Sequence, residues 1–273
     1  MAREVPAGAT GERAALLRLA VPLVAQQVGF QLMGNVDAAL LGHYSDTGLA
    51  AAGTGNNLLF AIFSLGMGLV LGLDTVAPQA LGAGRHADAR RALSAGLRIA
   101  LLAGLACTLL TLAAPLLLIP IGVPREVADD ARAYLAMRAF GIVPAMVSVA
   151  LRSYLAAHDV TRPLVIAVVL GNLANAALDV VLIFGAGPIP SLGVLGAGLA
   201  TVTVQTATLG IYFAGVRAID GRAPRPASTR ADLAHILRYG VPIAGHMFAE
   251  IGIFGVATMI AAHLGTIPAA AHS

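Results

Sequence analysis

Long apolar runs alternate with short polar connections along the whole chain. An α-helix rises about 1.5 Å per residue, so roughly 20 apolar residues cross the ~30 Å hydrocarbon core of a bilayer. Each apolar run in this sequence is at least that long. The pattern predicts seven membrane-crossing helices, over residues 15–42, 55–80, 92–119, 133–156, 163–185, 193–216 and 236–264.

The composition agrees with a membrane protein. Hydrophobic residues make up 58% of the chain and charged residues 11%, whereas a soluble domain typically has about 25% charged residues. The 31 glycines suit helices that pack backbone to backbone in lipid. We therefore predict an all-α polytopic membrane protein. Its expected parts are a six-helix transmembrane lobe over residues 1–216, a linker over 217–235 and, over 236–273, the first helix of a second, incomplete lobe.

The 17 basic residues are all arginines, and most lie in every second connection. Arg90 and Arg91 lie between the second and third runs, and four further arginines lie within the 217–235 linker, whereas residues 186–192 carry no charge. The positive-inside rule places the N-terminus and the linker in the cytoplasm. The chain is therefore expected to be a multi-pass protein of the cell inner membrane. Because the arginines are spread over short loops, no nucleic-acid partner is expected.

The start of the first run is similar to the start of the seventh. Residues 17–23 read LRLAVPL and residues 237–243 read LRYGVPI. Because six runs separate the two copies, both enter the membrane in the same orientation, which is the parallel type of repeat found in transporters. The second copy is incomplete in this sequence. We therefore expect the chain to be truncated after its seventh helix, and a second lobe or self-association to complete it.

Three acidic residues lie inside the predicted spans, namely Asp37, Asp179 and Glu250. An ionisable group at mid-bilayer costs at least about 2.5 kcal/mol, so it is normally functional or paired. Asn172 and Asn175 precede Asp179 at spacings that place all three on one helical face. The acids and this stripe of amides are candidates for binding a cation or a proton.

The first span carries a second polar stripe, Gln31 and Asn35, near the face of Asp37. Together with Asn172, these amides are candidates for lining a substrate cavity. The alternative is that the amides only hydrogen-bond neighbouring helices and that Asp37 lies in the membrane interface. Arg138, in the fourth span, is expected to snorkel or pair near the interface.

The sequence contains no enzyme signature. It has no HExxH motif, no GxSxG motif, no phosphate-binding P-loop and no paired Cys/His spacing. We therefore expect a protein that is not an enzyme and that has no catalytic residues and no cofactor. Transport would draw on a gradient of Na⁺ or H⁺, and Na⁺ held at Asp37 and Asp179 is the one metal ion expected.

Several motifs, taken in order along seven spans, carry a family resemblance. They are VPL at 21–23, NVDAALLGH at 35–43, PQALG at 78–82, NAALDVVLIFG at 175–185, GVLGAGLAT at 193–201 and AE at 249–250. Together they resemble the multidrug and toxin extrusion (MATE) family. The resemblance covers nearly the whole chain, as the first of the family's two six-helix lobes plus the seventh helix.

This resemblance implies export of cationic, amphipathic drugs or toxins in exchange for Na⁺ or H⁺, by alternating access between two lobes. Asp37 resembles the first-helix acid of the amino-terminal lobe. Asn175, Asp179 and Thr201 resemble the polar set that completes that lobe's cation site. Glu250 falls where the NorM-type bacterial branch has its seventh-helix acid.

Two other functions stay open at the level of sequence. A related lipid-linked saccharide flippase would be favoured by a strongly basic cavity, whereas the spans show mainly acids and amides. A non-transporting, truncated membrane fragment is favoured by the incomplete second repeat. Both would share the predicted helical fold.

Overall fold

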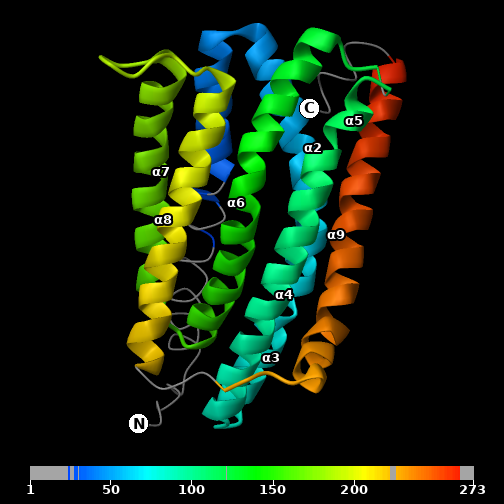
Figure 1. Cartoon of the computed structure of the whole chain (residues 1–273). Helices are drawn as coiled ribbons and strands as arrows, with labels where there is room; N and C mark the ends of the chain where they lie inside the picture. The colour runs from blue at the N-terminus through cyan, green and yellow to red at the C-terminus, as the bar shows by residue number, and fades with distance from the viewer. Residues whose placement is uncertain (1–23, 25–27, 30, 121, 222–225, 265–273) are drawn as a thin grey trace, which may run out of the picture.

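The computed structural model describes residues 24, 28–29, 31–120, 122–221 and 226–264 (Figure 1). The beginning of the first predicted span, and with it the 17–23 copy of the repeat, lies outside the described residues. Residues 31–44 are helical, in agreement with the later part of that span. The second copy of the repeat, residues 237–243, lies within a helix.

The described elements are helical, which confirms the predicted all-α class. They are α2 (Asp46–Leu71), α3 (Leu73–Gly82), α4 (His86–Ala113), α5 (Pro115–Leu118), α6 (Arg125–Ala157), α7 (Arg162–Phe184), α8 (Val194–Asp220) and α9 (Arg230–Leu264). Among the described residues, five helical segments are long and apolar enough to cross a membrane. Two of these are the nearly continuous pairs α2–α3 and α4–α5.

Two helices, α2 and α9, begin before the apolar runs and are capped there by polar side chains. The hydroxyl of Ser45 accepts a hydrogen bond of 3.1 Å from the backbone N–H of Gly48, so α2 begins well before residue 55. At the start of α9, Thr229 and Asp232 form a capping box, in which each side chain accepts from the other residue's backbone N–H. The hydrogen bond from the backbone N–H of Thr229 holds the pKa of Asp232 below its ordinary value. Helix α8 ends at Asp220 and α9 begins at Arg230, so both extend into the predicted 217–235 linker.

Helix α6 is central to the bundle. It packs against α2, α4 and α8, while α7 packs on α8. Helix α9 packs on α2, with further contacts to α3 and α4. As Figure 1 shows, α7 and α9 therefore lie at opposite edges of the bundle.

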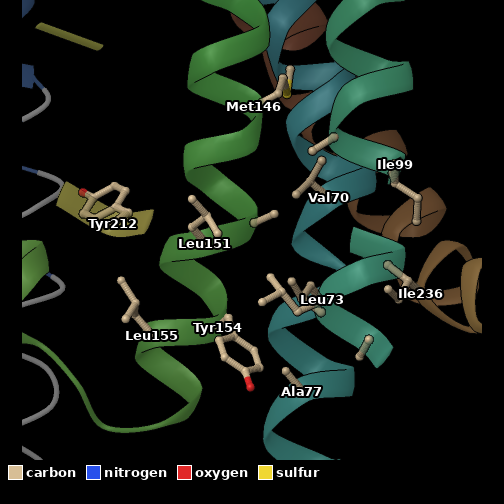
Figure 2. Close-up of a cluster of buried hydrophobic side chains, with 14 of the residues drawn as sticks. Val70, Leu73, Ala77, Ile99, Met146, Leu151, Tyr154, Leu155, Tyr212 and Ile236 are labelled. Atoms are coloured by element: carbon tan, nitrogen blue, oxygen red, sulfur yellow. The ribbon is translucent and has the colours of Figure 1, made fainter. Parts of the chain in front are cut away.

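The largest apolar core is formed by residues of α2, α3, α4, α6, α7, α8 and α9. Figure 2 shows Leu73, Leu151 and Ile236 in this core, contributed by α3, α6 and α9. All three side chains are fully buried. Helix α9 is thus packed onto the preceding helices through the same core that holds them together.

The contact between α2 and α9 depends on glycine. A Cβ atom at Gly240 would overlap the backbone carbonyl of Leu69, and one at Gly72 would overlap the carbonyl of Ile236. A Cβ at Gly68 would likewise overlap the backbone of Ala244. The two helices therefore approach with their backbones nearly in contact, which small residues allow in membrane bundles.

Candidate cation-binding site

Three helical segments bring a cluster of buried polar side chains together. Asp37 comes from the 31–44 helix, Asn175 and Asp179 from α7, and Thr201 from α8. All four side chains are buried, and Asp179 is 0% exposed. In the packed apolar interior, such groups need partners within the protein.

The amide of Asn175 joins the two carboxylates. Its Nδ2 atom donates to Asp37 Oδ1 at 2.5 Å and also to Asp179 Oδ2. Thr201 Oγ1 lies 3.1 Å from Asp37 Oδ2 and 3.0 Å from the carbonyl oxygen of Ala197. Since a hydroxyl has one proton, Thr201 donates to only one of these acceptors at a time.

The cluster has more acceptors than donors. Asn175 Oδ1 and Asp179 Oδ1 are buried and have no hydrogen-bond partner among the described residues. Buried polar atoms are normally paired, so an unpaired amide oxygen and an unpaired carboxylate oxygen in a cluster with two acids form a site that favours a cation or a proton. In the described part of the chain, no three or more His, Cys, Asp and Glu side chains gather as a metal-binding group.

The stripe of amides predicted on α7 is only partly directed at the cluster. Asn175 lies one turn before Asp179 and contacts it, whereas Asn172 is half-buried and donates to the carbonyl of Val168 on its own helix, at 2.9 Å. Gln31 and Asn35, the other proposed cavity residues, are exposed on the 31–44 helix. An exposed face is compatible with a cavity wall that a further lobe would cover.

Glu250 is not part of this cluster. Its side chain is 59% exposed and lies 4.0 Å from that of His246, one turn earlier on α9. Helix α9 packs on α2, α3 and α4, at the other edge of the bundle from α7 (Figure 1). The sequence placed Glu250 in one set with Asp37, but the described structure separates the two.

Tyr134 and Arg138 are neighbours of the cluster that the sequence did not reveal. Both lie on α6, and the Arg138 Cζ atom is 5.8 Å from the centre of the Tyr134 ring. Tyr134 packs in one apolar cluster with Leu41, Ile183 and Ala197, which come from the same three helical segments as the polar cluster. The sequence predicts that Arg138 snorkels or pairs near the interface. The prediction of snorkelling is wrong, because its side chain is only 8% exposed within the bundle.

The fold and the cluster together define a class of protein. An all-helical bundle with long apolar spans and large exposed apolar side chains is a multi-pass membrane protein, and buried acids in such a bundle are typical of ion and substrate pathways. The family follows from comparison with known proteins. A family model described as MatE matches residues 22–181, and the chain belongs to this family, whose members are transporters and not enzymes.

Curated relatives extend over nearly the whole chain. A probable multidrug resistance protein NorM of Bradyrhizobium diazoefficiens is 36% identical over 267 residues, which are 94% of this chain and 56% of that protein. The multidrug resistance protein MdtK of Edwardsiella ictaluri is 28% identical over 274 residues, covering 96% of this chain and 59% of that protein. The chain thus spans a little more than half the length of these relatives.

Solved structures share the fold. A MOP superfamily transporter from Pyrococcus furiosus superposes with a TM-score of 0.80 at 23% identity, over 94% of this chain and 57% of that one. A eukaryotic MATE transporter, AtDTX14, superposes with a TM-score of 0.81 at 20% identity, over 92% of this chain and 56% of that one. The helical arrangement is therefore that of slightly more than half of a MATE transporter.

Proposed function

We propose that the chain is the amino-terminal lobe, with the first helix of the second lobe, of an ion-coupled exporter of cationic, amphipathic compounds. The observation that carries this proposal is the buried cluster of Asp37, Asn175, Asp179 and Thr201, which holds two carboxylates and two unpaired acceptor oxygens. The names of its relatives as multidrug resistance proteins support the class of substrate.

Binding of an ion at the cluster would change its net charge, and this change would drive the movement of the helices. When Na⁺ or a proton binds, it neutralises part of the buried negative charge and stabilises the packing of the 31–44 helix against α7 and α8. When the ion leaves, the repulsion between Asp37 and Asp179 favours a different packing. The ion thus shifts the population between two states because it binds one of them better.

The lobe assignment extends the proposal to the whole protein. Residues 1–216 would form the first lobe, 217–235 the cytoplasmic linker, and 236–273 the start of the second lobe, in the inner membrane. Glu250, exposed in the described structure, would then serve the second lobe. The partner would be that second lobe or a second copy of this chain, and the substrate would pass between the two.

Replacement of Asp37 tests the coupling. In a two-lobe protein that carries this chain as its first lobe, Asp37→Asn preserves size and removes the titrating charge. We expect it to abolish export driven by an imposed Na⁺ or proton gradient in reconstituted vesicles, with unchanged membrane insertion. Asp74→Asn is the matched control, because Asp74 is an exposed acid on α3 and should leave export intact.

The same vesicles test the need for a second lobe. The 273-residue chain as a demonstrated monomer should show no gradient-driven export, because alternating access requires two bodies that move around a central site. Export by the monomer, or full export by the Asp37→Asn protein, would contradict the proposal.

A further inference from the structure

Arg138 is a buried cation that forms no ion pair with any of the described residues. Its side chain is 8% exposed, and its Nε and Nη1 atoms are buried without a hydrogen-bond partner among the described residues. The guanidinium carbon lies 5.8 Å from the centre of the Tyr134 ring, which offers a cation–π contact. A buried charge is costly unless it is compensated, so its surroundings must supply negative charge.

The neighbours of Tyr134 show which groups supply that charge. Tyr134 packs in one apolar cluster with Leu41, Ile183 and Ala197. Each of these three residues lies one helical turn from a polar residue of the cluster on the same helix. Leu41 follows Asp37 by four positions, Ile183 follows Asp179 by four, and Ala197 precedes Thr201 by four.

Asp37, Asp179 and Thr201 thus lie at one level of the bundle, which we call the polar layer, and Arg138 lies at the same level. Tyr134 precedes Arg138 by four residues on α6, which runs antiparallel to α7 and parallel to α8 along the chain's up-and-down path. A step of one turn, about 5.4 Å, therefore leads from the apolar layer to the polar layer on all four helices.

We infer that Arg138 is a resident countercharge of the carboxylate cluster. It leaves the cluster with one net negative charge instead of two, and so weakens the binding of the exchanging cation. The inference rests on the proposed function and deepens it. With Arg138 in place, one monovalent cation balances Asp37 and Asp179. Without it, two negative charges would face the entering cation, and the site would bind more tightly and release more slowly.

Equilibrium binding of radioactive sodium to the purified full chain in detergent tests this role. Loss of the charge in Arg138→Gln, or in the apolar Arg138→Met if the first variant does not fold, should tighten sodium binding by roughly tenfold or more. Arg138→Lys keeps the charge and should bind as the unaltered chain does. Arg152→Gln removes a half-buried arginine from the same helix and should also leave the affinity unchanged.

Each other outcome has a definite meaning. Unchanged affinity in both neutral variants, or tighter binding in Arg138→Lys as well, would overturn the inference, because charge would not be the cause. Absence of sodium binding in every variant would overturn it too, while the proposed function would still be judged on proton-driven export. Sodium binding that survives Asp37→Asn would instead remove the proposed site itself.

Discussion

At the residue scale, one amide holds two acids in place. Asn175 donates to both Asp37 and Asp179. The bond to Asp37 crosses from α7 to the 31–44 helix, and the bond to Asp179 lies within α7. An amide nitrogen has two hydrogens, so it serves one carboxylate with each. Its removal would leave both acids with fewer donors in a buried setting. Asn175 therefore has a structural role that can be measured separately from ion binding.

We predict that Asn175→Ala lowers the free energy of unfolding by about 1–3 kcal/mol, because buried acceptors lose their donor. Thermal unfolding in detergent measures the effect. Asn172→Ala is the matched control, since Asn172 is one turn earlier and donates to its own helix at Val168. A loss of stability for Asn172→Ala as large as that for Asn175→Ala would argue against the bridging role.

At the scale of elements, the α2–α9 contact joins the seventh predicted span to the preceding helices. Gly72 and Gly240 each face a backbone carbonyl of the other helix, without room for a Cβ. Close backbone approach gives extensive van der Waals contact, which is the main attraction between helices in lipid. The contact also fixes the position of α9, and so of Glu250, relative to the lobe.

A larger side chain at this contact should separate the helices. We expect Gly240→Leu to destabilise the protein by about 1–3 kcal/mol or more, as overpacking does in a close-packed core. The matched control is Gly245→Leu on the same helix, where a Cβ would meet nothing within 4 Å. Melting temperatures in detergent compare the two, and equal melting temperatures would contradict the close approach.

At the scale of the whole molecule, the arginine-rich connections gather at one end of the bundle. Arg98 Nη1 donates to the Ser228 carbonyl at 2.9 Å, which joins α4 to the segment before α9. The hydroxyl of Tyr154, near the end of α6, donates to Asp220 at the end of α8, also at 2.9 Å. At the opposite end, Ser191 contacts Tyr44. Arg217 and Arg230 lie at the end of the bundle opposite the uncharged residues 186–192, which supports the proposed orientation with the linker in the cytoplasm.

Reporter fusions test that orientation. A reporter inserted in the 217–235 linker should be active in the cytoplasm, and one inserted in 186–192 should be active in the periplasm. Arginines are frequent in the first segment and absent from the second, which is the asymmetry that sets topology. Inverted labelling of the two fusions would reverse the proposed orientation.

Much of the fold could be predicted from the sequence because local hydropathy determines which segments of the chain cross the membrane. The described helices cover the predicted spans, and their differences lie at the ends, where Ser45 and Thr229 act as caps. Hydropathy marks the part of a helix that meets lipid, and it does not register a polar first turn. The start of the first span lies outside the described residues, so that part stays a prediction.

The sequence by itself determined that buried acids and amides exist in these spans, because their cost in lipid makes them conspicuous. It also placed Asn175 one turn from Asp179. Only the tertiary structure decided which helix faces meet. That choice depends on the rotation of each helix about its axis, which close packing sets and hydropathy does not. It brought Arg138 into the layer of Asp37, and it left Glu250 exposed on α9, at the other edge of the bundle from α7.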